Sequence, residues 1–158
     1  MRILGIDPGY GTVGFGAIEL NGTEWELVDT GVITTDSEEV MPNRLLQIYE
    51  DISMLIDEIK PDLFAIEELF FVQNITTGLQ VSEARGVILL AAAQSDLPIY
   101  EYAPNEIKMS ITGYGHAEKR QMQIMVQEIL NLKQRPSPDD AADALAVALT
   151  CGFDRVRL

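Results

Sequence analysis

Four acidic residues are placed where they could act together. Asp7 ends the first predicted strand and Glu67 ends the fourth, while Asp140 and Asp143 lie three residues apart near the start of the last predicted helix. That spacing puts the two aspartates on one helix face. Carboxylates at the ends of central strands are costly to bring together unless a cation neutralises them. With no His or Cys ligand candidates nearby, the set predicts an oxygen-only site for Mg²⁺ or Mn²⁺.

Such a site predicts phosphodiester chemistry. A pair of ions roughly 3.5–4 Å apart can activate a water and stabilise the leaving oxygen of a phosphodiester. The alternative for the helical acids is N-terminal capping and dipole complementation, which accounts for Asp139 or Asp140 but poorly for Asp143, a turn inside an apolar helix. We expect Asp139 to be a cap or surface charge, and Glu68, next to Glu67, to face away from the metals.

Period-two and period-three-to-four patterns divide the chain into five strands and five helices. Asn21-Gly22 is the strongest hairpin signal, and Lys60-Pro61 predicts the end of the first helix. Three meandering strands followed by β-α-β units predict an α/β fold with a mixed five-stranded sheet flanked by helices. The expected strands are 2–7, 12–20, 24–34, 62–67 and 98–102, and the expected helices are 42–60, 76–95, 104–112, 117–132 and 138–151.

Length and composition indicate one globular domain over residues 1–158. Apolar runs are too short for a membrane helix, and the lone Cys151 forms no internal disulfide, so we expect a soluble, cytoplasmic protein with Cys151 buried. The net charge of −14 argues against a nucleic-acid partner, but residues 102–135 carry a local excess of positive charge. A basic surface on an acidic body is therefore compatible with DNA binding.

The segment from Gly9 to Gly14 matches the G-x-G-x-x-G dinucleotide fingerprint. That fingerprint must open a helix, whereas these residues enter an alternating strand pattern, so we reject it. The phosphate-binding hairpin of actin-like ATPases begins similarly, but those proteins need two lobes and this chain has length for one. We expect the glycines to provide backbone freedom in a tight turn.

Five motifs follow one another along the chain. They are Gly5-Ile6-Asp7-Pro8-Gly9, Phe64-Ala65-Ile66-Glu67, Glu83-Ala84-Arg85-Gly86-Val87, Ala117-Glu118-Lys119 and Asp140-Ala141-Ala142-Asp143-Ala144-Leu145-Ala146. In order and separation they resemble the bacterial RuvC crossover-junction endonucleases, and the resemblance covers essentially the whole chain. It implies a ribonuclease H-like fold and a homodimer that binds a four-way DNA junction and nicks two opposing strands. By this resemblance, Asp7, Glu67, Asp140 and Asp143 form a Mg²⁺-dependent catalytic site that holds two ions.

Five further residues are expected to contact DNA. Lys108 and Lys119 match family lysines that contact phosphates, and Arg120 lies in the same positive segment. Phe70 matches an aromatic residue expected to stack on an unpaired base at the junction centre, which is worth about 1–3 kcal/mol per base. Arg85 is expected either to reach a phosphate or to pair with a nearby carboxylate.

Two alternative functions remain, and one partner protein is also considered. A ribosomal-RNA-processing nuclease of the related YqgF type shares the opening Gly5-Ile6-Asp7-Pro8-Gly9, and a non-catalytic junction-binding module would use the acidic surface to recruit proteins. The intact carboxylate set argues against the second. A branch-migration helicase is a candidate partner. His116, the only histidine, is expected to be a loop residue or a cap, and Phe71 is equally suited to core packing.

Overall fold

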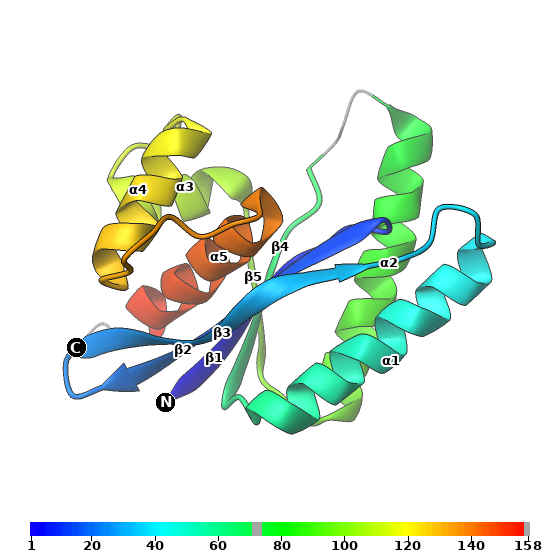
Figure 1. Ribbon diagram of the computed structural model, residues 1–158, viewed down its shortest axis with the longest axis horizontal. Coiled ribbons are helices and arrows are strands. Elements are labelled where there is room, and N and C mark those ends of the chain that lie inside the picture. Colours follow the sequence, from blue (N-terminus) through cyan, green and yellow to red (C-terminus); the bar gives the residue numbers. More distant parts are fainter. Residues whose placement is uncertain (71–73, 157–158) are drawn as a thin grey trace.

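A computed structural model describes residues 1–70 and 74–156 (Figure 1). All ten predicted elements are present in the predicted order. The strands are β1 (Arg2–Asp7), β2 (Thr12–Asn21), β3 (Glu24–Thr34), β4 (Leu63–Glu67) and β5 (Ile99–Tyr102). The helices are α1 (Met41–Ile59), α2 (Ile75–Gln94), α3 (Pro104–Thr112), α4 (Lys119–Ile129) and α5 (Asp139–Arg155).

The five strands form one mixed sheet in the order β3-β2-β1-β4-β5. β1 pairs antiparallel with β2 and parallel with β4, and β4 pairs parallel with β5. Ile6 is opposite Ile66 in the β1–β4 register. The carboxyl ends of these neighbouring strands therefore meet at one edge of the sheet, and this brings Asp7 and Glu67 side by side.

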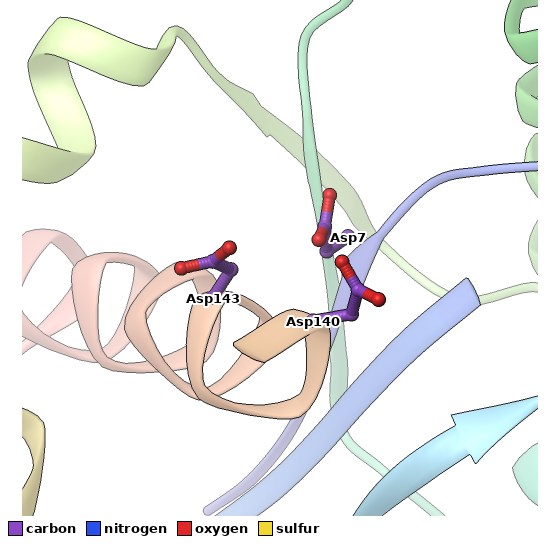
Figure 2. Close-up of side chains that lie close together, drawn as sticks. All are labelled: Asp7, Asp140 and Asp143. Atoms are coloured by element: carbon purple, nitrogen blue, oxygen red, sulfur yellow. The ribbon is translucent and has the colours of Figure 1, made fainter. Parts of the chain in front are cut away.

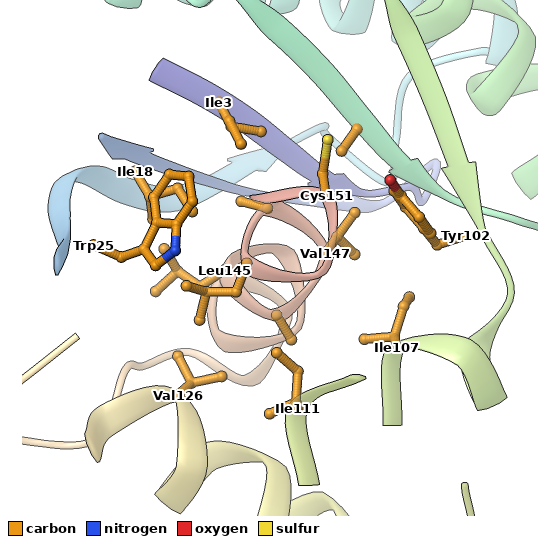
Figure 3. Packing of buried hydrophobic residues seen from close by; sticks show 14 of the residues in the cluster. Ile3, Ile18, Trp25, Tyr102, Ile107, Ile111, Val126, Leu145, Val147 and Cys151 are labelled. Carbon is orange, nitrogen blue, oxygen red and sulfur yellow. The ribbon is translucent and has the colours of Figure 1, made fainter. Parts of the chain in front are cut away.

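Helices cover both faces of the sheet. In Figure 1, α3, α4 and α5 lie on one side and α1 and α2 on the other. The alternation of β1 assigns its residues to these layers: Leu4 and Ile6 pack with α1 and α2, whereas Ile3 packs with α5 (Figure 3). Asp7 follows the parity of Ile3 and therefore faces α5. By the same alternation, Glu67 has the parity of Ala65, which packs in the α5 layer.

Glycines allow α5 to lie directly on β1 and β2. A Cβ on Gly14 would sit 2.0 Å from the backbone oxygen of Asp140, and one on Gly5 would sit 2.4 Å from that of Ala144. None of the glycines from Gly9 to Gly14 has a positive φ; the described glycines that do are Gly22 and Gly113. Gly9 and Gly14 are needed because other backbone approaches them closely: a Cβ on Gly9 would lie 2.1 Å from the backbone oxygen of Thr12.

Several element boundaries differ from the sequence prediction. Helix α4 is shorter than expected and spans Lys119–Ile129 instead of 117–132. The two-residue loop of the β2–β3 hairpin is Gly22-Thr23, one residue later than expected, with Gly22 at φ +64°. A positive φ at the first loop position is typical of a II′ turn. Helix α5 continues past Cys151 to Arg155. Gly152, in this added turn, leaves room for the ring of Trp25, which lies 2.5 Å from a Cβ built there. Cys151 itself is buried, as predicted.

Among the described residues, no helix combines the length and hydropathy needed to cross a bilayer.

Candidate active site

Three aspartates converge at the edge of the sheet where β1 ends. Asp7 comes from β1, and Asp140 and Asp143 come from the first turns of α5 (Figure 2). One carboxylate oxygen from each lies within 4.8 Å of the others, and all three residues are half-buried. The structure thus brings together three of the four predicted ligands.

Capping does not explain the aspartates of α5. The N-cap residue is Pro138, and no side chain makes a capping hydrogen bond at this helix end. Asp139 is therefore not the cap that the sequence suggested. It is a surface charge, which accepts a hydrogen bond of 2.8 Å from the Gln123 amide. Asp140 and Asp143 instead point toward Asp7 (Figure 2).

Glu67 lies beside the three aspartates. It lines a cavity of about 260 Å³ together with Asp143, Lys108 and Lys119. Glu67 follows Ile66, which is opposite Ile6 in the β1–β4 register, so Glu67 and Asp7 are neighbours at the sheet edge. Glu68 is exposed, as the alternation predicted.

Asp7, Glu67 and Asp143 hold their protons more tightly than isolated carboxyl groups do, because their pKa values are raised. Burial, followed by repulsion from Glu67, Asp143 and Asp140, raises the pKa of Asp7 to about 8. Burial likewise raises the pKa of Glu67, with repulsion from Asp143 adding to it. Like charges held together in a partly dry site are unfavourable unless a cation compensates them. The donor set consists of carboxylate oxygens alone and so fits a hard divalent cation such as Mg²⁺.

Two lysines extend the site onto α3 and α4. The Lys119 Nζ lies 3.1 Å from a carboxylate oxygen of Asp143 and 3.4 Å from one of Asp139. Burial raises the pKa of Asp143, and the contact with Lys119 opposes that rise. Lys108 lines the same cavity, and its charge acts on Glu67. Both lysines are therefore within reach of a group that enters beside the carboxylates.

The other predicted DNA contacts occupy different environments. Phe70 follows β4 with its side chain 60% exposed, and Arg120 is exposed at the start of α4. Arg85 is mostly buried: its Nε donates to the backbone oxygen of Glu67 at 3.0 Å, and its guanidinium pairs with Glu101. Arg85 thus makes the carboxylate pair that the sequence left open, and its phosphate contact stays a prediction. Phe71 lies outside the described residues.

Sequence reasoning missed Glu101 as the partner of Arg85. Glu101 is opposite Ile66 in the parallel β4–β5 pair, one position before the end of β4. Once β5 is placed next to β4, that register could have indicated the pairing. The pair orders Arg85, and Arg85 in turn holds the main chain at Glu67.

The sheet order, the helical layers and the carboxylates at the ends of β1, β4 and the start of α5 define a ribonuclease H-like domain with a nuclease-type acidic centre. Residues 3–151 match the family model described as crossover junction endodeoxyribonuclease RuvC. A protein of that name from Thermosipho melanesiensis is 55% identical over 148 residues, 94% of each chain. One from Petrotoga mobilis is 52% identical over 96% of this chain and 93% of its own.

A solved structure agrees. The Thermus thermophilus RuvC in complex with a Holliday junction substrate is 35% identical with a TM-score of 0.93, covering 98% of this chain and 94% of that one. The chain belongs to the RuvC family of crossover junction endodeoxyribonucleases.

Proposed function

We propose that the protein is an endonuclease that resolves four-way DNA junctions by paired nicks. The observation that carries this proposal is the convergence of Asp7, Asp140 and Asp143 within 4.8 Å in a member of the RuvC family. The complex of Thermus thermophilus RuvC with a Holliday junction substrate, which shares the fold over nearly the whole chain, supports the choice of substrate.

Asp7, Glu67, Asp140 and Asp143 would hold two Mg²⁺ ions, for which Mn²⁺ would substitute. When bound, the cations supply an activated water and stabilise the leaving oxygen of the phosphodiester. The chain's own part is to position the carboxylates: β1 and β4 fix Asp7 and Glu67 at one sheet edge, and the close packing of α5 on Gly14 fixes Asp140.

Lys108 and Lys119 would bind the phosphates of the strand to be cut. They line the cavity that contains Glu67 and Asp143, so a phosphate in that cavity meets two ammonium groups beside the acidic centre. Phosphate contacts of this kind position nucleic acid without reading its sequence. Phe70 would stack on an unpaired base near the junction centre, since its exposed ring offers a face for stacking.

A homodimer would present two equal sites to the two equivalent strands of a junction. Helix α2 offers a surface for it. Ile75, Leu79 and Leu90 are 77%, 62% and 52% exposed and recur on one helix face, and a Cβ at Gly86 between them would meet nothing within 4 Å. An apolar stripe with a small residue at its centre fits close packing against a second copy of itself. The branch-migration helicase, the cytoplasmic location and the single-domain organisation stay predictions.

The proposal is tested with three substrates: a synthetic four-way junction, a linear duplex and a structured RNA, each incubated with the protein in Mg²⁺ and in chelator. We expect paired nicks in the junction in Mg²⁺ alone. Cleavage of the RNA but not the junction would favour the ribosomal-RNA-processing nuclease. Junction binding without cleavage under every metal condition would favour the binding module.

A further inference from the structure

A second cavity opens next to the acidic centre. We call it the α3 slot. It has a volume of about 370 Å³, at the small end of the ~300–1,000 Å³ typical of ligand pockets. It shares Pro104 and Lys108 with the cavity that contains Glu67 and Asp143, so Lys108 stands between the two. The slot is lined by Phe70, Pro104, Asn105, Lys108, Gly115 and His116.

The charge of the slot differs from that of the protein around it. The chain has 25 acidic residues, yet none of the described residues that line the slot is acidic, and Lys108 is a cation. A larger cavity of about 870 Å³ on α3 shares Asn105, Gly115 and His116 with the slot, and its lining also includes Glu106 and Asp154, which would repel a phosphate. Phe70 and Lys108 line the slot but not the larger cavity, so the Lys108 side of the slot is the part whose charge suits a phosphate.

Its side chains offer stacking and base-edge contacts. Phe70 is 60% exposed, and the one ring contact of His116 within the described chain is an edge-on approach to Tyr114 at 5.7 Å. Asn105 makes no side-chain hydrogen bond to any described residue, so its amide can both donate and accept toward a ligand. Two rings and one amide are the elements with which proteins hold and read an unpaired base.

The glycine at position 115 is a further argument for a ligand in the slot, because the fold does not require glycine there. Its φ lies outside the left-handed region, and the nearest atoms to a Cβ built on it are 3.7 Å away, an ordinary contact. Gly113, two residues earlier, needs its φ of +74°. Neither packing nor backbone conformation therefore requires glycine at position 115. Its effect on the slot is that no side chain projects from this part of the lining, which leaves space for a ligand.

We infer that the α3 slot receives one nucleobase of the cleaved strand next to the scissile phosphate. This inference rests on the proposed function. In this proposal Asn105 reads the edge of the base, His116 and Phe70 stack on it, and Lys108, which lines both cavities, binds the adjacent phosphate. Asn105 and His116 are thus specificity residues, distinct from the carboxylates that perform the cut.

The first test measures base preference. Junctions randomised at the two nucleotides on each side of the scissile phosphate are nicked by the wild type, Asn105→Ala, His116→Ala and Gly115→Val. Ser110→Ala, on α3 but outside the slot, is the matched control. We expect the wild type and the control to prefer one base at one position, and each slot variant to reduce that preference roughly tenfold. Unchanged preference in all three slot variants would overturn the inference.

The second test does not depend on cleavage. Junctions carry the fluorescent base 2-aminopurine at each of the four positions in turn and are bound in Ca²⁺. Stacking in the slot should quench one position in the wild type and the Ser110→Ala control, and His116→Ala should lose at least half of that quenching. Equal fluorescence at all positions would contradict the slot even if the wild type nicks normally. Quenching at one position without nicking would instead contradict the proposed function and keep the slot.

Discussion

Neighbouring residues at this site have different roles because backbone geometry turns them in different directions. On α5, Asp140 and Asp143 converge on Asp7, whereas Asp139 lies 65% exposed against Lys119 and Gln123. On β4, Glu67 enters the cavity and Glu68 faces solvent. The alternation of a strand and the 100° step of a helix explain both separations, so these assignments could be made from sequence alone.

The lysines lead to a prediction about salt. Lys108→Ala and Lys119→Ala should each weaken junction binding and reduce the slope of log affinity against log salt by about one. The measurement is a fluorescence-anisotropy titration in chelator over a series of salt concentrations. Lys60→Asn is the control, because Lys60 lies between α1 and β4 at the opposite sheet edge, and Asn tolerates its left-handed φ of 50°. Slopes equal to the wild type in both variants would remove the lysines from the interface.

Asp7 leads to a prediction about stability. Its pKa is raised to about 8 in the folded protein, so between about pH 4 and pH 8 the unfolded chain releases a proton that the folded chain keeps. The free energy of unfolding of the metal-free protein must fall as pH rises through this window. Asp7→Asn should weaken that dependence, because the raised pKa values of Glu67 and Asp143 still contribute to it, and should stabilise the protein at pH 8 by on the order of 1–3 kcal/mol.

Urea unfolding in chelator at pH 5 and pH 8 measures this effect. Asp139→Asn is the control, because hydrogen bonding from Gln123 and pairing with Lys119 lower the pKa of Asp139. Its carboxylate contributes stability at neutral pH that is lost in acid, so removing it should not stabilise the protein. An Asp7→Asn protein less stable than the wild type at pH 8 would contradict the account of the acidic centre.

At the scale of elements, the contact between α5 and the sheet decides whether the site forms. A Cβ at Gly14 would lie 2.0 Å from the backbone oxygen of Asp140, and backbone at both positions leaves little room to adjust. Gly14→Ala should therefore destabilise the protein by about 2–4 kcal/mol and displace Asp140 from Asp7.

Thermal unfolding measures the loss of stability in Gly14→Ala, and a nicking assay measures the effect of the displaced Asp140. Gly11→Ala is the matched control in the same segment, because the nearest atom to its Cβ would be the end of the Arg44 side chain at 3.4 Å. The control should keep its melting temperature. If Gly14→Ala keeps both the melting temperature and the nicking rate of the wild type, the packing of α5 does not position the site.

Sequence patterns predicted the elements well because the signals are local. Alternation in β2, the short apolar run of β4, the Lys60-Pro61 stop and the amphipathic pattern of α1 predicted these elements, and the direction of Glu67 followed from its place in β4. The fit of Gly5 and Gly14 under α5 could not be predicted, since it depends on which helix crosses which strand. The pairing of Arg85 with Glu101 could not be predicted either, because Glu101 lies on β5, which comes close to Arg85 only in the folded protein.

At the scale of the molecule, a dimer is needed for paired nicks, and α2 is the surface proposed for it. Light scattering at micromolar concentration should give about twice 17.5 kDa. Leu79→Glu with Leu90→Glu should give the monomer mass, because charges on the stripe oppose its burial. Leu46→Glu, an equally exposed leucine on α1, is the control and should stay dimeric. A wild-type mass near 17.5 kDa would contradict the dimer.

The whole molecule is acidic, with a net charge of −14, and its proposed DNA contacts gather around one sheet edge. We therefore expect long-range attraction to DNA to be weak and binding to depend on the proposed local contacts at Lys108, Lys119 and Phe70. Such an arrangement should favour substrates that fill the site over plain duplex.

The central claim is that the four carboxylates cut both strands of a junction. The most direct measurement uses a junction labelled on two opposing strands, incubated in Mg²⁺ with the wild type, Asp7→Asn, Glu67→Gln, Asp140→Asn or Asp143→Asn, and with the neighbouring controls Glu68→Gln and Asp139→Asn. We predict symmetric nicks by the wild type and most of that activity in the controls. The four carboxylate variants should bind the junction in a gel shift with Ca²⁺ but should not cut it. Normal cutting by Asp140→Asn together with an inactive Asp139→Asn would contradict the assignment of the site.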